Sequence, residues 1–552
     1  MAYDLLIKNG TVVDGTGAPR IQADVAITNG KIAEIGKIKD GAAKVIDADG
    51  LIVAPGFIDP HTHYDAQIWW DDLVTCSSWH GITTTIMGNC GVGIAPCKPE
   101  MREIAAWDLV NVEGIPFDVL KRGIDWKWET FPQYIDAAAH HKLGINVGFL
   151  APLTPFRHYI MGEESMERAA RPEEIVQIKR LIHDAVAAGA MGWSTSKAAN
   201  HVGYQGRPLA SRLASLDELV AYASVLKELG RGTIEFNLNV TGNFTDDDYK
   251  VLDALLTASG RPVTWLAVFV RNCKEVLAKV EPLVKRGGIP QVSAVPVVRN
   301  VDLRTPGSFA ALPTFGRVLN KPLEVMRKEY ADPSFHDGFR RDMSLKVARP
   351  DLKRLRVEEV QRPDLKSYEG KSLTQIAQER GVDLVDAFLD LSCADELRTR
   401  FTDMPMSEDG MDVLLSDPRT MIGLSDGGAH VDAHCEAGYP TYLIGHWVRK
   451  KQLFSLERAV ELITSHPADI FGVVGRGRLA PGMAGDVVIF DYDTIDTKMR
   501  QHQIRDLPGG GARFVMTAQG INYTIVNGEV LYEDGKHTGA LPGQVVRSQR
   551  MN

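Results

Sequence analysis

Apolar, strand-like runs alternate with helical stretches along most of the chain, and this alternation limits the possible folds more than any other feature. Strands that alternate with helices predict βα units, an α/β class and a parallel sheet. Eight such units predict a (β/α)8 TIM barrel, whose functional groups gather at the carboxyl ends of the strands. The strand-like runs are Phe57–Ile58, Ile82–Met87, Gly144–Leu150, Gly189–Ser194, Gly232–Leu238, Pro262–Val268, Pro290–Val295 and Met421–Ser425.

Both ends of the chain have the pattern of a small β unit. Asn-Gly pairs lie between short apolar runs at Asn9-Gly10, Asn29-Gly30 and Asn527-Gly528. Such pairs are typical of type I′ hairpins, because both central residues tolerate positive φ. Two β segments that are too small to be independent most simply pair into one composite β-sandwich, and two unrelated β flaps are the alternative.

The expected domains follow from these patterns. Residues 1–54 and 476–552 form the two parts of the β-sandwich, and residues 55–475 form the barrel. Residues from about 300 to 418 are too many for one βα connection, which commonly has about 2–6 residues. This segment is rich in charged residues and predicts a helical insertion that covers the barrel mouth.

Composition excludes several classes of partner and compartment. The chain has 552 residues, of which 44% are hydrophobic and 24% charged, and its net charge of -9 does not favour nucleic acid or an acidic membrane as a partner. Six scattered cysteines do not make a disulfide framework. No signal peptide pattern and no apolar run of membrane-spanning length is present. We expect a cytoplasmic protein with a small-molecule substrate, and a homo-oligomer is compatible with this sequence.

A His-x-His pair follows the first barrel strand, in Phe57-Ile58-Asp59-Pro60-His61-Thr62-His63. Side chains two residues apart in an extended chain point to the same side, so His61 and His63 can converge on one ion. Neutral imidazole is the commonest metal ligand and suits Zn²⁺. A pair of surface histidines at a strand end is the alternative.

Three motifs in order, Ala54–Asp65, Ile82–Gly91 and Gly423–His430, resemble the amidohydrolase superfamily, and together they resemble its N-acyl-D-amino-acid deacylase (D-aminoacylase) branch. The resemblance implies a metal-dependent barrel with a composite sandwich. It also implies that Asp426 binds metal and takes the proton from the attacking water, although an N-cap aspartate is the alternative. Cys90 matches the position of a thiolate ligand in this branch, although free cysteine is often simply a small buried residue.

The chain departs from the branch at the fifth and sixth strands, where the family supplies two histidines. These strands end here in Asn237-Leu238-Asn239 and Ala267-Val268-Phe269. Neither sequence offers a strong ligand for a transition metal. We therefore expect one Zn²⁺ ion rather than two, held by His61, His63 and Asp426, with Cys90 as the fourth ligand.

Three further residues are expected to bind substrate. Lys197 and His201 follow the fourth strand, and His430 lies four residues after Asp426. Lys197 is expected to contact a substrate carboxylate; its alternative role is a carboxylated bridge between two metals, as in hydantoinase-like relatives. His201 has two alternative roles, a replacement ligand or an ordinary loop residue, and His430 has one, support of Asp426. His80, His140 and His141 are expected at the surface.

The predicted reaction is hydrolysis of an amide bond in an N-acyl amino acid or a similar small N-acylated acid. A metal-activated water attacks the carbonyl, and Asp426 is the general base and then the general acid. One alternative is hydrolysis of a cyclic amide or urea-type bond, which requires two bridged metals. Another is a non-catalytic scaffold that has lost metal ligands, but retention of His61, His63 and Asp426 argues against it.

Overall fold

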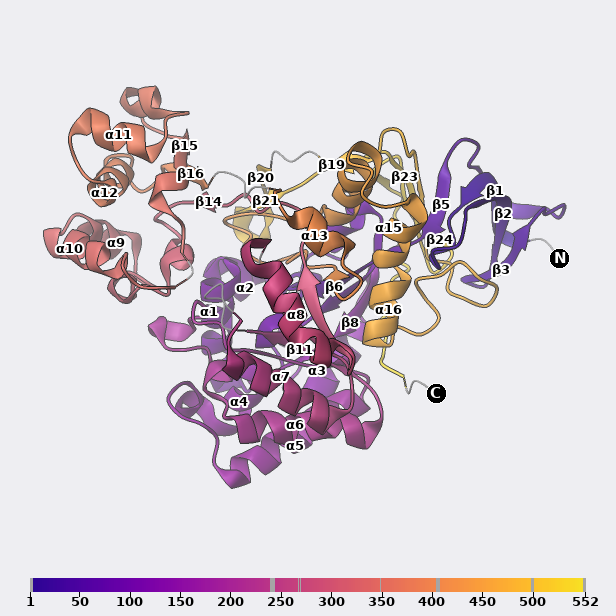
Figure 1. Cartoon of the computed structure of the whole chain (residues 1–552), viewed down its shortest axis with the longest axis horizontal. Coiled ribbons are helices and arrows are strands. Elements are labelled where there is room, and N and C mark those ends of the chain that lie inside the picture. Colours follow the sequence, from indigo (N-terminus) through magenta and orange to yellow (C-terminus); the bar gives the residue numbers. More distant parts are fainter. Residues whose placement is uncertain are drawn as a thin grey trace.

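The computed structural model describes residues 3–238, 244–266, 268, 270–347, 349–403, 408–497 and 501–549. Figure 1 shows a central α/β body, a lobe from the middle of the chain on one side, and a β region that holds the N-terminus on the other. Three residues named above at the ends of the fifth and sixth strands, Asn239, Ala267 and Phe269, lie outside the described residues.

The described barrel strands form a closed parallel ring with eight positions. The short strands β8 and β9 follow each other directly and share one of these positions. One sheet has the order β6-β7-β8 and another the order β17-β13-β12-β11-β10-β9. The strands are β6 (Phe57–Thr62), β7 (Ile82–Met87), β8 (Asn146–Phe149), β9 (Ala151–Pro152), β10 (Gly192–Ser196), β11 (Thr233–Asn237), β12 (Val263–Leu266), β13 (Gly288–Val292) and β17 (Met421–Ile422).

These sheets join into one barrel at two seams. Strands β8 and β9 are separated by Leu150 alone, whose N–H donates to the carbonyl of Met87 at 2.8 Å. At the other seam Thr62 bridges Gly427 in parallel, and the N–H of His63 donates to the carbonyl of Gly427 at 2.7 Å. This seam matters for function because it places the chain after β17 beside the chain after β6.

Helices pack outside the ring, and local sequence explains where several of them begin and end. The α6 helix (Leu216–Leu229) begins with a capping box between Ser215 and Glu218 and ends at Gly230, which has a φ of 66°. A serine cap and a glycine in the left-handed region are the usual signals for these two ends. The other helices of the barrel region are α1 (Arg102–Glu113), α2 (Phe117–Gly123), α3 (Phe131–Ala139), α4 (Leu153–Met161), α5 (Pro172–Ala187), α7 (Asp246–Ser259), α8 (Cys273–Val284), α14 (Tyr439–Tyr442), α15 (Leu456–Leu462) and α16 (Ser465–Phe471).

The two ends of the chain share one sheet, in the order β25-β24-β23-β18-β5-β1-β2-β3, with β4 paired to β1. The join is the antiparallel pair of β5 and β18, in which Val53 lies opposite Ile489. The strands are β1 (Tyr3–Val12), β2 (Ile21–Thr28), β3 (Lys31–Gly36), β4 (Ala42–Asp47), β5 (Ile52–Pro55), β18 (Val487–Phe490), β23 (Ile521–Val526), β24 (Glu529–Glu533) and β25 (Lys536–His537). Two short pairs follow β18, β19 (Asp496–Thr497) with β22 (Ala518–Gln519) and β20 (His502–Leu507) with β21 (Gly511–Val515).

One of the three predicted hairpins is wrong. Asn29-Gly30 and Asn527-Gly528 both have positive φ and connect antiparallel neighbours. Asn9-Gly10 instead lies inside β1, where the pairing with β2 shifts register between Ile7 and Gly10. A bulge of this kind needs the positive φ of 60° at Asn9, and a Cβ at Gly10 would lie 2.4 Å from Val53. The pair therefore serves a bulge and a close approach rather than a turn.

The predicted insertion is a lobe with its own apolar core, and it contains strands as well as helices. Figure 1 shows it standing out from the barrel. Buried aromatic residues fill its core, among them Phe309, Phe315, Phe339, Phe388 and Phe401. Its elements are β14 (Asn300–Val301), α9 (Leu323–Tyr330), α10 (Pro333–Asp342), β15 (Leu355–Glu359), α11 (Leu373–Arg380), α12 (Leu384–Ala394) and β16 (Arg400–Asp403), and α13 (Met411–Ser416) follows it.

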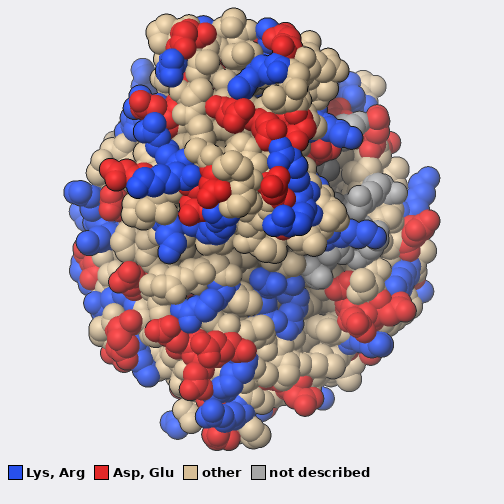
Figure 2. Space-filling model, turned by 90° about the vertical axis from the view of Figure 1, so that its left-hand side faces the viewer, with Lys and Arg blue, Asp and Glu red and all other residues tan. Residues whose placement is uncertain are grey.

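The face of the molecule seen in Figure 2 has no single-sign charged patch among the residues drawn in colour. Acidic and basic side chains are interspersed over the face seen in Figure 2, and among the residues drawn in colour there neither sign dominates. Within the described ranges, no helix combines the length and the apolarity needed to cross a membrane.

Candidate metal centre

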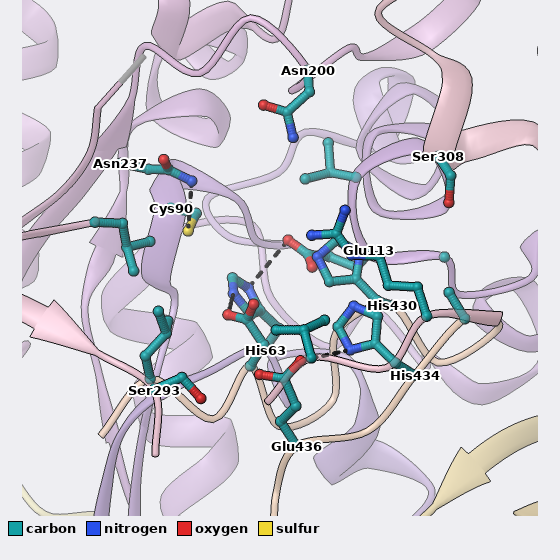
Figure 3. Close-up of a pocket in the computed structure, with 18 of the residues that line it drawn as sticks. His63, Cys90, Glu113, Asn200, Asn237, Ser293, Ser308, His430, His434 and Glu436 are labelled. Carbon is teal, nitrogen blue, oxygen red and sulfur yellow. Dashed lines mark hydrogen bonds and ion pairs between the residues drawn. The ribbon is translucent and has the colours of Figure 1, made fainter. Parts of the chain in front are cut away.

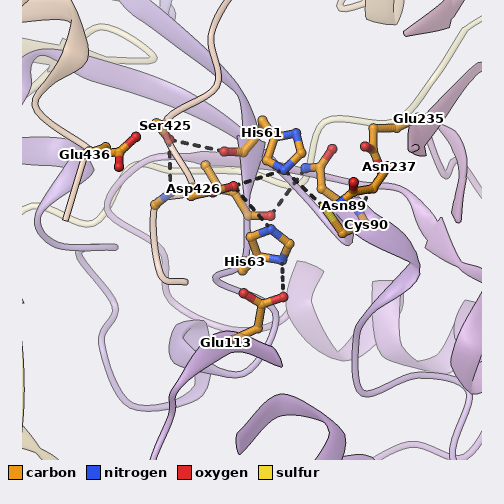
Figure 4. Close-up of polar contacts among 12 residues, drawn as sticks. His61, His63, Asn89, Cys90, Glu113, Glu235, Asn237, Ser425, Asp426 and Glu436 are labelled. Carbon is orange, nitrogen blue, oxygen red and sulfur yellow. Dashed lines mark hydrogen bonds and ion pairs between the residues drawn. The ribbon is translucent and has the colours of Figure 1, made fainter. Parts of the chain in front are cut away.

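His61 and His63 converge on one carboxylate at the end of β6, as Figure 4 shows. The Nε2 atom of His61 lies 3.2 Å from Oδ1 of Asp426, and the Nε2 atom of His63 lies 3.7 Å from the same oxygen. Both imidazoles are buried, so their position is set by the barrel wall rather than by solvent. The alternative of two surface histidines is therefore excluded.

Asp426 reaches this point because the last strand closes the barrel against the first. Its φ of 47° turns the chain sharply after β17. The hydroxyl of Ser425 donates to Oδ2 of Asp59 at 2.7 Å and accepts from the N–H of Gly427 at 3.0 Å. Burial would raise the pKa of Asp426, but the contacts with His61 and His63 outweigh it and hold that pKa well below its usual value. Asp426 is thus a carboxylate at neutral pH.

Cys90 completes a cluster of potential ligands. The ligand atoms of His61, His63 and Cys90 all lie within 4.8 Å of one another. The sulfur of Cys90 lies 3.5 Å from Nε2 of His61. The backbone N–H of Cys90 donates to Oε2 of Glu235 at 2.6 Å. Two imidazoles, a thiol and the Asp426 carboxylate are the donor types that zinc takes in proteins.

The outer nitrogens of both histidines face acceptors. Nδ1 of His61 lies 2.8 Å from Oε1 of Gln291, and Nδ1 of His63 lies 3.2 Å from Oε1 of Glu113. Acceptors at Nδ1 favour the tautomer whose Nε2 lone pair is free for a metal. The arrangement therefore fits a pair of metal ligands, and it identifies two supporting residues that the sequence analysis missed.

Several buried acidic groups surround the centre, and a positive charge there would stabilise their ionised forms. Burial, reinforced by Asp426, raises the pKa of Glu113 well above its usual value. Burial likewise raises the pKa of Glu235 to about 7 and that of Glu436 to about 8. Burial also raises the pKa of the Cys90 thiol, with Glu235 and Asp426 acting in the same direction. A cation at the centre would relieve all four groups, which is a second reason why these residues fit a metal ion.

A cavity of about 330 Å³ opens beside the centre. Figure 3 shows His63, Cys90, Glu113, His430, His434 and Glu436 arranged around it. An apolar wall includes Val110, Leu266, Val268, Val292, Val295 and Leu414, and polar groups include Asn200, His201, Arg299, Ser308, His430 and His434. Ser308 belongs to the insertion lobe, so the lobe contributes directly to the cavity.

His201 and His430 lie at this cavity, where the sequence analysis expected them. Nδ1 of His201 lies 3.0 Å from Oγ of Ser196, and its Nε2 lies 3.3 Å from Nδ2 of Asn237. Burial lowers the pKa of His201 to about 3 and that of His430 to about 4, so both are neutral at pH 7. The cluster of potential metal ligands found among the described residues is His61, His63 and Cys90, and it does not include His201. The alternative role of His201 as a replacement metal ligand therefore has no support.

Lys197 does not reach the cavity, which corrects its expected role as a substrate contact. Its ammonium group donates to the carbonyl of Arg212 at 2.7 Å and also to the carbonyl of Ala214. Burial lowers the pKa of Lys197 to about 8. The reason is local hydrogen bonding: the loop after β10 folds back so that these two carbonyls accept from the ammonium, which holds it away from the cavity and from a bridging position.

His80 is not at the surface, which corrects another expectation. It is buried, with Nδ1 lying 2.8 Å from Oγ1 of Thr441 and Nε2 lying 3.1 Å from the carbonyl of Met516. These partners come from late segments of the chain that pack over it, and a single helical stretch gives no sign of such a contact. His140 is exposed, as expected, and His141 is half-buried.

Comparisons with known proteins agree with this geometry. The chain matches the profile of Amidohydro_3, described as the amidohydrolase family, over residues 44–311 and 396–532. The chain belongs to the amidohydrolase family. It is thus an enzyme of the class that hydrolyses carbon–nitrogen bonds in non-peptide amides. The interval between the matched ranges falls in the insertion lobe.

Individual relatives lie in the branch named above. The chain is 28% identical to the D-aminoacylase of Alcaligenes xylosoxydans xylosoxydans, over 99% of this chain and 97% of that protein. It is 28% identical to the N-acyl-D-glutamate deacylase of the same organism, over 99% of this chain and 96% of that protein. A solved structure of an N-acyl-D-glutamate deacylase from Bordetella bronchiseptica contains zinc and a phosphonate inhibitor. It superposes on this chain with a TM-score of 0.68, and the two are 24% identical over 99% of this chain and 100% of that one. The predicted fold, a barrel with a composite β-sandwich, is confirmed.

The support of His63 by Glu113 gives a testable result. We expect Glu113→Gln to weaken zinc binding about 10- to 100-fold, because loss of a carboxylate behind a ligating histidine typically has this effect. Competition with a chromophoric chelator measures the affinity. Glu103→Gln, an exposed position on the same helix, is the control and should leave zinc affinity unchanged. Equal affinity of the Glu113 variant and the wild type would show that Glu113 does not orient His63.

Proposed function

We propose that the protein hydrolyses the amide bond of an N-acyl amino acid, or of a similar small N-acylated acid, with one zinc ion held by His61, His63, Cys90 and Asp426. The observation that carries this proposal is the convergence of both Nε2 atoms on one oxygen of Asp426 beside a cavity. Relatives whose names describe deacylation of N-acyl-D-amino acids support the substrate class.

One ion rather than two is favoured by what lies at the ends of the fifth and sixth strands. Asn237 ends β11 and its Nδ2 lies 3.4 Å from the sulfur of Cys90. Leu266 ends β12, and both it and Val268 line the cavity as apolar groups. An amide and two aliphatic side chains do not hold a second transition metal. Lys197 does not offer a bridge between two metals either, because its ammonium group is hydrogen-bonded to two carbonyls.

The chain's own groups can perform proton transfer. A zinc ion, when bound, supplies Lewis-acid polarisation and lowers the pKa of a coordinated water towards about 7. Asp426, ionised and facing the cavity, accepts the proton of the attacking water and returns it to the leaving nitrogen. His430, neutral and on the cavity wall, is placed to donate a hydrogen bond to the substrate.

The cavity has complementary ends for the two parts of such a substrate. Arg299 lines the cavity and is exposed, so its guanidinium can meet a carboxylate that enters from solvent. The aliphatic wall, which includes Val292 and Val295, suits an acyl chain or an apolar side chain. We assign carboxylate recognition to Arg299 in place of Lys197.

A substrate panel tests this proposal. The zinc-loaded enzyme is assayed with N-acetyl-D- and N-acetyl-L-amino acids of apolar, acidic and polar side chains, and with hydantoin and dihydrouracil. We expect hydrolysis of at least one N-acyl amino acid series and none of the cyclic amides. Turnover of the cyclic amides alone would contradict the proposal, and so would inactivity towards both N-acyl series.

A further inference from the structure

We propose that Cys76 and Cys435 form an oxidisable dithiol, whose disulfide cross-links the two segments that carry the candidate metal ligands. The two sulfur atoms lie 3.2 Å apart, although the residues are 359 positions apart in the chain. Both thiols are free in the reduced protein. A disulfide bond is about 2.05 Å long, so the sulfurs need to approach by only about 1.1 Å.

The position of the pair connects it to the active site from both sides. Cys435 lies between His434 and Glu436, which line the cavity, and it follows Asp426 in the same loop. Cys76 lies between β6, which leads to His61 and His63, and β7. A bond between the two sulfurs would therefore link the loop after β17 to the segment after β6, and neither cysteine is itself a candidate metal ligand.

Neighbouring groups hold the two cysteines in place. The guanidinium of Arg513 donates through Nη1 to the carbonyl of Thr75 at 2.7 Å and through Nη2 to Oγ1 of Thr75 at 2.6 Å. The carbonyl of Cys435 accepts from Nε2 of Gln501 at 2.9 Å. These hydrogen bonds hold the chain directly before Cys76 and at Cys435 itself, so the backbone is anchored on both sides of the pair.

The surroundings also favour a reactive thiolate. The hydrogen bond from Cys435 lowers the pKa of Cys76, and the positive charge of Arg513 acts in the same direction. Cys76 is buried, whereas Cys435 is partly exposed, so a small oxidant can approach the pair from the Cys435 side. A thiolate beside a second thiol and near an arginine is the usual setting of a redox-sensitive cysteine.

The oxidation balances with a peroxide as the oxidant. The thiolate of one cysteine attacks a peroxide oxygen, the O–O bond breaks, and a sulfenic acid and one water form. The sulfur of the second cysteine then displaces the hydroxyl of the sulfenic acid as a second water, and the S–S bond forms. Two thiols lose two protons and two electrons, and hydrogen peroxide takes them up to become two waters.

Closure of the bond is expected to lower turnover. Movement of Cys435 by about 1 Å shifts the adjoining His434 and Glu436, and misplacement of this size in a catalytic site can cost up to about 10²-fold in rate. This consequence rests on the proposed function, whereas formation of the disulfide does not.

The test treats the zinc-loaded, full-length enzyme with hydrogen peroxide, so that the metal protects Cys90. Alkylation and peptide mass spectrometry should find a Cys76–Cys435 cross-link and two fewer free thiols than the six of the reduced chain. We expect kcat/KM to fall at least about tenfold and to return after dithiothreitol. Absence of the cross-linked peptide would overturn the proposal whether or not a substrate is known.

Variants separate the pair from other thiols. Cys435→Ala and Cys76→Ala should each resist inactivation by peroxide, and the partly exposed Cys435 position keeps the test available if the buried Cys76 variant does not fold. Cys393→Ala, a partly exposed thiol in the insertion lobe, is the matched control and should remain sensitive. Inactivation of Cys435→Ala equal to that of the wild type, or a cross-link that leaves kcat/KM unchanged, would overturn the link to turnover.

Discussion

His61→Asn combined with His63→Asn should yield a folded protein that binds no zinc and has no measurable turnover. Both imidazoles offer Nε2 to the same point, and asparagine supplies at most a weak oxygen donor there. The pair lies at a strand end, and the asparagine side chain is smaller than imidazole, so we expect the barrel to survive. Metal analysis, circular dichroism and the N-acyl amino acid assay measure these three properties.

The control for this pair is His140→Asn with His141→Asn, a second histidine pair that lies away from the cavity. It should retain both zinc and activity. A His61 and His63 double variant that still bound one zinc ion per chain would place the metal centre elsewhere.

Asp426→Asn should keep the fold and the metal but lose most of the rate. The substitution preserves volume and an oxygen that can still contact a metal, and it removes the base. General acid–base assistance is worth about 10²–10⁴-fold, which corresponds to about 3–5 kcal/mol of transition-state stabilisation. We expect kcat to fall by at least about 10²-fold with KM little changed. Steady-state kinetics and metal analysis of the same sample provide the measurement.

The pH profile adds an independent readout for Asp426. Its carboxylate is ionised at neutral pH, so activity should fall as acid protonates it or the attacking water. The acidic limb of the profile should change in Asp426→Asn. Asp412→Asn, an exposed aspartate on α13, should match the wild type in rate and in pH profile. Wild-type turnover by Asp426→Asn would refute the role assigned to this residue.

The sequence predicts the barrel and its two histidines well because both depend on short-range periodicity. Alternation of strand and helix determines the ring, and the two-residue period of a strand places His61 and His63 on one side. Asp426 follows the last strand, so ring closure brings it beside the first strand, and its expected roles as ligand and base come from the family resemblance. Gln291 is the second residue of the predicted run Pro290–Val295, whereas β13 ends at Val292, so the sequence did not place it at a strand end.

Other features depend on contacts that no local pattern encodes. Glu113 lies at the end of a helix, where glutamate is ordinary, and only the packing of α1 over the barrel brings it to His63. Lys197 follows a strand as a functional residue would, yet two nearby carbonyls hold it away from the cavity. The approach of Cys76 to Cys435 likewise arises from ring closure between segments that are distant in sequence.

Zinc titration of the chelator-stripped enzyme tests the central claim most directly. The metal-free protein is mixed with increasing zinc, and hydrolysis of the best N-acyl amino acid from the panel is followed at each step. One centre of His61, His63, Cys90 and Asp426 predicts no activity without zinc and a plateau that is reached at one equivalent per chain. Activity that required a second equivalent, or that persisted in the fully stripped protein, would contradict the account.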